Sequence, residues 1–202
     1  MREVEVKYSV ADVDAVIAAL RAWGVHFGEA VYQDDQAFAP VGWSFGGSKL
    51  GVSFLRLRTV DGRHWFALKQ PGVNAQDCLE YETEVLDRRQ MHEAILRMGY
   101  WATVRVAKSR RTGRHGDVAL CLDEVEGVGT FLELERMVPD GEPAAAVQDE
   151  LAAFVTSLGI EAVRTAETYD SLVRAAQEGA VRVPSSRAST DAASAAVTSS
   201  AV

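Results

Sequence analysis

Charged and aliphatic residues alternate in one segment after another along this chain of 202 residues. Residues 3–7 read Glu-Val-Glu-Val-Lys, and residues 55–58 read Leu-Arg-Leu-Arg. Successive side chains of a β-strand point to opposite faces, so each segment would present charges on one face and aliphatic side chains on the other. The alternation therefore predicts strands with one polar face, as found in antiparallel sheets.

Eight segments have this strand-like character, and four others show helical periodicity. The strands are expected at 2–8, 30–38, 53–60, 63–70, 79–86, 103–110, 117–124 and 130–138. The helices are expected at 10–23, 88–98, 143–158 and 166–177. Ser9 and Asp87 are the N-cap candidates of the first two helices. Asp61-Gly62 is a favoured two-residue hairpin turn. The pattern predicts an α+β protein built on an antiparallel sheet.

The charges of these strands are grouped by sign. Glutamates repeat at 3–5, 80–84 and 133–135, whereas cations occupy 56–58, 69 and 108–110. For any one strand, a solvated outer face is the ordinary explanation. Like charges repeated along a strand face repel one another, however, and threonine, the usual residue of exposed strand faces, is scarce there. Together the strands favour a closed barrel with a polar lumen, whose aliphatic faces pack outward beneath the helices.

A lumen with both signs of charge suits a particular class of ligand. Arginine and lysine bind polyanions through phosphate oxygens. Clustered carboxylates bind hard divalent cations such as Mg²⁺ or Mn²⁺. A metal–triphosphate complex requires both groups, whereas a glycosidase with paired carboxylates would not need so many cations. The sequence therefore predicts a metal-dependent enzyme that binds a triphosphate.

Composition narrows the partners and the location. A net charge of −8 argues against a general nucleic-acid binder. No apolar run is long enough to span a membrane, and the charged first residues form no apolar signal core, so we expect a cytoplasmic protein without a membrane segment. Cys78 and Cys121 are expected to be buried thiols. Residues 1–178 are expected to form one domain, followed by a disordered Ala/Ser-rich tail at 179–202.

The opening Glu3-x-Glu5-x-Lys7 resembles the N-terminal signature of the CYTH superfamily, the triphosphate tunnel metalloenzymes. Further motifs that resemble this family follow in the same order. They are Arg56-x-Arg58, Leu68-Lys69-Gln70-Pro71-Gly72, Glu80-x-Glu82-x-Glu84, Lys108-x-Arg110, Asp123-Glu124-Val125-x-Gly127-x-Gly129, Phe131-x-Glu133-x-Glu135 and Thr168-Tyr169. One Glu-x-Glu-x-Lys is a weak signal, but this ordered series is specific and extends over about residues 1–172.

The resemblance implies a closed eight-stranded antiparallel tunnel with the helices outside, and it implies roles for individual residues. The metal ligands, for Mg²⁺ or Mn²⁺, would come from Glu3, Glu5, Glu82, Glu84, Asp123, Glu133 and Glu135, with Glu80 as a further acidic candidate. The triphosphate would be bound by Lys7, Arg56, Arg58, Lys69, Lys108 and Arg110. Glu5, Lys69 and Glu135 would be the catalytic residues. Analogy with the family alone supports the hypothesis of a homodimer, because the sequence does not determine the oligomeric state.

Within the superfamily the chain resembles the class IV adenylyl cyclase branch, on Gln33-x-Asp35 before Phe38 and on the segment that begins at Leu122. This branch implies conversion of ATP to cyclic AMP and pyrophosphate. Hydrolysis of inorganic tripolyphosphate, thiamine triphosphate or a nucleoside triphosphate is the alternative, and a non-catalytic binding module for polyphosphate or a nucleotide is the third hypothesis.

Two features depart from the family pattern. Gly113 stands where many members carry an aromatic residue. The segment 41–51 is an insertion before the Arg-x-Arg strand, and it contains Trp43 and Phe45. These aromatic rings would either stack on a base at the mouth of the tunnel or anchor the loop.

Overall fold

The computed structural model describes residues 2–181. The predicted tail at 179–202 lies outside this range, apart from residues 179–181, which belong to the last helix. No helix in the described part of the chain combines the length and apolar character that a membrane crossing needs.

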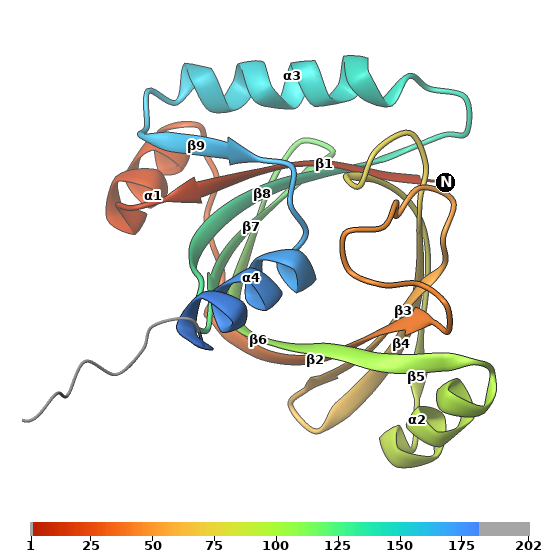
Figure 1. Cartoon of the computed structure of the whole chain (residues 1–202). Coiled ribbons are helices and arrows are strands. Elements are labelled where there is room, and N and C mark those ends of the chain that lie inside the picture. The colour runs from red at the N-terminus through yellow and green to blue at the C-terminus, as the bar shows by residue number, and fades with distance from the viewer. Residues whose placement is uncertain (1, 182–202) are drawn as a thin grey trace, which may run out of the picture.

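The strands form one antiparallel sheet that closes on itself (Figure 1). Their bounds are β1 Arg2–Val10, β2 Val31–Pro40, β3 Phe54–Val60, β4 Arg63–Pro71, β5 Asp77–Val85, β6 Tyr100–His115, β7 Val118–Val125, β8 Gly129–Val138 and β9 Ala162–Thr165. The hydrogen-bonded order is β5-β4-β3-β2-β6-β7-β8-β1-β9, and pairing of β5 with β1 closes the first eight strands into a barrel. The closure is short, because it uses only residues 2–4 of β1. The predicted α+β class and closed eight-stranded barrel are confirmed.

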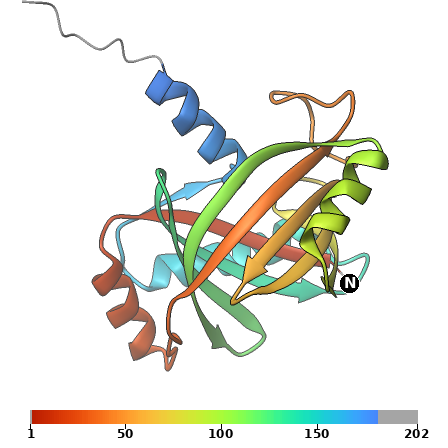
Figure 2. The same cartoon turned by 90° about the horizontal axis from the view of Figure 1, so that it is seen from below.

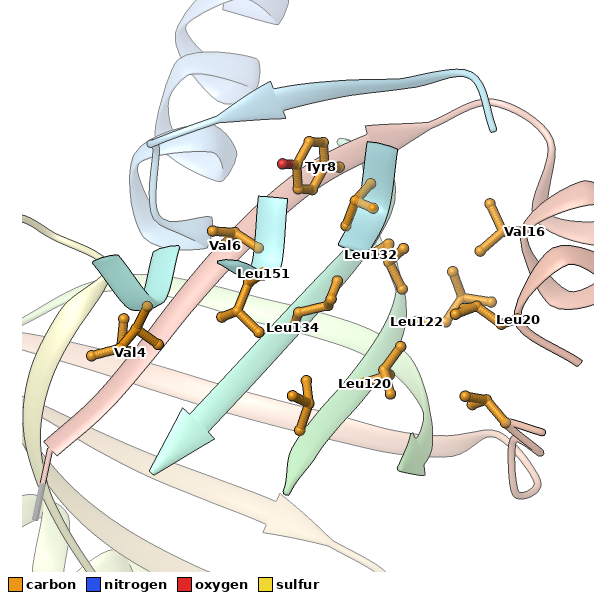
Figure 3. Close-up of a cluster of buried hydrophobic side chains, with 14 of the residues drawn as sticks. Val4, Val6, Tyr8, Val16, Leu20, Leu120, Leu122, Leu132, Leu134 and Leu151 are labelled. Carbon is orange, nitrogen blue, oxygen red and sulfur yellow. The ribbon is translucent and has the colours of Figure 1, made fainter. Parts of the chain in front are cut away.

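Within residues 2–181, four helices lie outside or at one end of the barrel (Figures 1 and 2). They are α1 Val13–Ala22, α2 Arg88–Arg97, α3 Ala144–Ser157 and α4 Tyr169–Val181. α1 and α3 cover the outer face of β1, β7 and β8 (Figure 3). Val6, Leu120 and Leu134 point outward from these strands, where they pack with Leu20 of α1 and Leu151 of α3.

The opposite side of the barrel has a second outer core. Ile95 of α2 is fully buried and packs in a cluster with Phe38, Leu55 and Leu57. The aliphatic half of each alternating strand therefore faces a helix, and the charged half is left for the lumen. This arrangement, with charged residues in the lumen and aliphatic residues outside, is the one that the sequence predicts.

Three local predictions meet different outcomes. Asp61 and Gly62 form the β3–β4 turn with φ angles of 49° and 76°, as predicted. Asp87 caps α2 as predicted, since its side chain accepts a hydrogen bond from the Gln90 amide. Ser9 does not cap α1; it lies in β1, and Asp12 caps the helix instead.

The strand β9 was not predicted. It has four residues, pairs only with residues 7–10 of β1, and occupies the edge of β1 that β5 leaves free. The fourth helix begins at Tyr169 rather than near residue 166, and residues 166–168 connect it to β9.

The fold explains the unusual Gly113. A Cβ atom at this position would lie 2.8 Å from Val25 Cγ1 and 3.2 Å from the carbonyl oxygen of His26. Val25 is buried, and its segment is tied to β6 by the hydrogen bond from the Gly28 amide to the Thr112 carbonyl oxygen. In this chain Val25 fills space that a side chain at residue 113 would take.

We expect Gly113→Ala to lower the free energy of unfolding by about 1–3 kcal/mol, because the added methyl group overpacks a filled site. Gly28→Ala is the matched control, since its Cβ would make only an ordinary contact 3.8 Å from Thr112. Urea denaturation of both variants measures the difference. Equal stability of the two would contradict the proposed crowding.

Candidate active site

A cavity lies in the lumen of the barrel, and its lining includes Trp43 and Lys49 of loop 41–51 and Tyr169 of α4. Its charged lining comes from β1, β2, β3, β4, β6 and β8, together with one residue of the loop and one of α4. These charged residues are Glu3, Glu5, Lys7, Asp35, Lys49, Arg56, Arg58, Lys69, Lys108, Arg110, Glu133, Glu135 and Asp170.

Three carboxylates gather at one point of this lining. Glu3 and Glu5 lie on the inward face of β1, and Glu135 lies on β8 directly opposite Glu5 in the strand register. One oxygen of each carboxylate lies within 4.8 Å of the other two. We call Glu3, Glu5 and Glu135 the carboxylate trio. Three oxygen donors this close fit a hard divalent cation such as Mg²⁺ or Mn²⁺.

Crowding of negative charge changes the acidity of the trio. Burial, together with the Glu133 charge, raises the pKa of Glu5 to about 7. Burial likewise raises the pKa of Glu135 to about 8, with a contribution from Glu3. The protein alone thus stabilises the charged forms of these two groups poorly, and a bound cation would favour those forms.

A cationic cluster lies beside the trio. Lys108 Nζ lies 2.9 Å from Asp123 Oδ2, and Arg110 contacts both oxygens of Asp123 at 2.7 and 2.5 Å. Arg110 also contacts Glu133, and its Nη1 lies 3.5 Å from Glu135. Lys7 Nζ lies 3.2 Å from Glu133. Arg110 therefore connects the cationic cluster to the trio.

The acidic members of this cluster orient cations. Asp123 has no exposed surface, and both of its oxygens are bonded to Lys108 or Arg110. Burial alone would raise the pKa of Glu133, but Lys7 and Arg110 hold it well below its usual range. Burial and the neighbouring Arg110 lower the pKa of Lys108. Asp123 and Glu133 were predicted as metal ligands, and the structure places them as partners of lysine and arginine.

A second cationic group comes from β3 and β4. Arg58 forms two hydrogen bonds of 2.7 Å with Asp35, whose pKa is lowered to about 2 despite its burial. Arg56 contacts Glu80 at 3.2 Å. Lys69 Nζ lies 2.7 Å from Glu80 and 3.2 Å from Glu3. Lys69 thus also borders the trio.

The structure separates two predicted ligands from the site. Glu82 lies 2.7 Å from Arg56, but its side chain is 39% exposed and it does not line the cavity. Glu84 is paired with Arg63 at 2.6 Å, and both side chains are largely exposed. β5 pairs with β1 only through residues 77–79, so its later residues run past the closed part of the barrel. Alternation along β5 puts Glu82 and Glu84 on the same face as Glu80, but the structure groups only Glu3, Glu5 and Glu135 closely among the described acidic residues.

Several residues take a place in the site that the sequence did not predict for them. Asp35 and Glu80 were named in the sequence motifs and prove to be partners of Arg58, Arg56 and Lys69. The Tyr169 ring lies over Lys7 Nζ at 4.1 Å and over Lys108 Nζ at 4.6 Å. Thr168-Tyr169 was one of the family motifs, so that signal was present in the sequence. Lys49 and Asp170 carried no comparable signal, because a loop and a helix start have no strand alternation.

Comparison with known proteins agrees with this geometry. The family model of the CYTH domain matches residues 1–169. The chain belongs to the CYTH domain family. CYTH proteins are also called triphosphate tunnel metalloenzymes, and the closed barrel of this chain has the tunnel architecture.

Individual relatives cover most of this CYTH chain. A protein of Methanocaldococcus jannaschii named "Putative adenylate cyclase MJ0240" is 27% identical over 162 residues, which cover 79% of this chain and 91% of that protein. The PH1819 protein from Pyrococcus horikoshii OT3 superimposes with a TM-score of 0.71 and is 24% identical, covering 86% of this chain and 98% of that one. A Hippeastrum protein, HpAC1, superimposes with a TM-score of 0.58 and is 18% identical, covering 87% and 96% of the two chains.

The raised pKa of Glu135 predicts how stability depends on pH. A carboxyl group whose folded pKa is about 8, against an ordinary 4.5, contributes stability at low pH that is lost as pH rises toward 8. With a chelator present, we expect Glu135→Gln to exceed wild type in unfolding free energy at pH 8 by on the order of 1 kcal/mol or more, and by less at pH 5. Urea denaturation at both pH values tests this. Glu84→Gln, in an exposed ion pair, is the control. An advantage of Glu135→Gln that is the same at pH 5 and pH 8 would contradict the assignment.

Proposed function

We propose that the protein is a metal-dependent enzyme that acts on a triphosphate, and that its reaction is the conversion of ATP to cyclic AMP and pyrophosphate. The observation that supports this proposal is the placement of the carboxylate trio beside two groups of cations in one closed lumen. The trio would hold Mg²⁺ or Mn²⁺, which would neutralise charge on the attacking and leaving oxygens.

The cations of the lumen would bind the triphosphate oxygens. Each of them already has a carboxylate partner: Lys7 is held by Glu133, Lys69 by Glu80 and Arg58 by Asp35. These partners fix the cations in place before the ligand arrives, which reduces the ordering cost of binding. The arginine forks match phosphate oxygens, and the lysines provide compact charge.

The carboxylate trio argues against a module that only binds a polyanion. Three carboxylates that face the ligand space repel a triphosphate unless a divalent cation lies between them. A passive anion site would gain affinity from neutral residues at these positions. We therefore retain the enzymatic proposal over the binding module.

Hydrolysis is the second candidate. In cyclisation the ribose 3′-oxygen attacks the α-phosphorus, whereas in hydrolysis water attacks a phosphorus atom, and both reactions would use the same charged lining. The description of the Hippeastrum protein, a CYTH-fold neighbour named as an adenylyl cyclase, reports that its triphosphatase activity is dominant. That description is a specific reason to test hydrolysis in parallel.

Product analysis distinguishes the candidates. Purified protein is incubated with Mg²⁺ or Mn²⁺ and, in parallel, ATP, thiamine triphosphate or inorganic tripolyphosphate. We expect cyclic AMP and pyrophosphate from ATP, and no product when a chelator is added. Orthophosphate without cyclic nucleotide would replace cyclisation by hydrolysis. Absence of turnover with every substrate and both metals would contradict the enzymatic proposal.

Substitution of the trio tests the metal site. We expect Glu5→Gln and Glu135→Gln each to lower kcat by about a hundredfold or more, because a neutral amide binds a divalent cation weakly. Circular dichroism checks that each variant is folded. Glu84→Gln is the matched control from the exposed end of β5, and its kcat should stay within about twofold of wild type. Equal losses in all three variants would refute the assignment of the trio.

A further inference from the structure

Loop 41–51 belongs to the connection between β2 and β3 and projects from the same side of the barrel as α4 (Figure 2). Two of its residues, Trp43 and Lys49, line the cavity that contains the charged site. The loop is therefore a wall of the substrate space, and its side chains are placed to contact a bound ligand.

Contacts with α4 and with Thr168, the residue before it, hold the loop in position. Lys49 Nζ donates hydrogen bonds to Thr168 Oγ1 at 2.5 Å, to Asp170 Oδ2 at 3.2 Å and to Ser171 Oγ at 2.9 Å. The guanidinium of Arg174 lies 4.5 Å from the ring centroid of Phe45. Loop 41–51 is thus attached to α4 at two points, and Phe45 serves as an anchor.

The indole of Trp43 is fixed in orientation. Its Nε1 donates a hydrogen bond to the Ser48 carbonyl oxygen at 3.0 Å. Its ring is packed edge-on by Phe45, with centroids 5.2 Å apart, and by Phe54, with centroids 5.0 Å apart. A large ring held by three neighbours loses little entropy when a ligand packs against it.

The cavity has two chemically different parts. The charged part contains the trio and the cations described above, whereas Ala37, Trp43, Phe54 and Val106 supply apolar lining. A bare inorganic triphosphate is charged along its whole length and would gain nothing from apolar contacts. An organic triphosphate could place its phosphates among the cations and a flat aromatic group against Trp43.

We propose that Trp43 is a specificity-determining residue that packs against a planar heteroaromatic group of the substrate. The substrate class is then an organic triphosphate, such as a nucleoside triphosphate or thiamine triphosphate, rather than inorganic tripolyphosphate. This inference rests on the proposed function, because it assigns the apolar part of the same site.

Equilibrium binding tests the inference separately from turnover. Titration calorimetry compares ATP, thiamine triphosphate and inorganic tripolyphosphate, each with Ca²⁺, a hard divalent ion that oxygen ligands hold. For the organic triphosphate that wild type binds more tightly, we expect Trp43→Leu to raise Kd by about tenfold and Trp43→Phe by much less, while the Kd of tripolyphosphate stays within about twofold. If the Kd of ATP rises, the group that packs against Trp43 is adenine; if the Kd of thiamine triphosphate rises, it is a ring of thiamine.

Trp65→Leu is the matched control, because Trp65 does not line the cavity and lies against Arg63 at the far end of β4. Unchanged tripolyphosphate binding in Trp43→Leu also shows that the variant is folded. The inference is overturned if Trp43→Leu weakens all three ligands equally or weakens none. If wild type binds none of the three, the proposed function itself fails, and that result is distinct from a failure of the Trp43 assignment alone.

Discussion

Burial of charge inside a closed barrel is the constraint on which the rest of this structure depends. An ionised side chain loses several kcal/mol of hydration when it leaves water, unless partners of opposite sign replace the solvent. The lumen meets this demand with pairs that cross between strands, such as Lys108 with Asp123, Arg58 with Asp35, and Lys69 with Glu80. These pairs require the strands to be in register, so the charged site and the closure of the barrel support each other.

The compensation is incomplete at one place. Glu5 and Glu135 face each other across β1 and β8, and their raised pKa values follow from burial next to further carboxylates. Local rules of stability are most often broken where a protein carries out its function. The same argument does not apply to Asp123 or Glu133, because lysine and arginine side chains bind their oxygens. Electrostatics thus divides the acidic lumen residues into a group that orients cations and a group suited to hold a metal.

Where α4 packs on the barrel, apolar and aromatic contacts replace the ion pairs of the lumen. Val173 of α4 packs with Val104, Val125 and Phe131 in an apolar cluster, and Tyr169 lies over two lysines of the lumen. An aromatic face is attracted to an ammonium group, so Tyr169 suits the boundary between the apolar cluster and the charged site. Loop 41–51 is attached to the same helix through Lys49, which makes the helix and the loop parts of one opening.

Alternation of side chains along the strands determined the fold class, the closed barrel and the sign of charge on each lumen strand, because the two-residue period of a strand is local and leaves a direct mark on the sequence. The ordered family motifs contain the lysines and arginines that line the cavity, apart from Lys49. Only the tertiary structure decided which carboxylates lie close together. Alternation predicts the face of the sheet on which a residue lies, but not its position along the barrel axis. The sequence therefore could not distinguish Glu84, which pairs with Arg63, from Glu135, which belongs to the trio. The tertiary structure also decided the positions of β9, Lys49 and Trp43. A four-residue edge strand and an irregular loop have no repeating side-chain pattern in the sequence, so contacts with neighbouring elements determine where they lie.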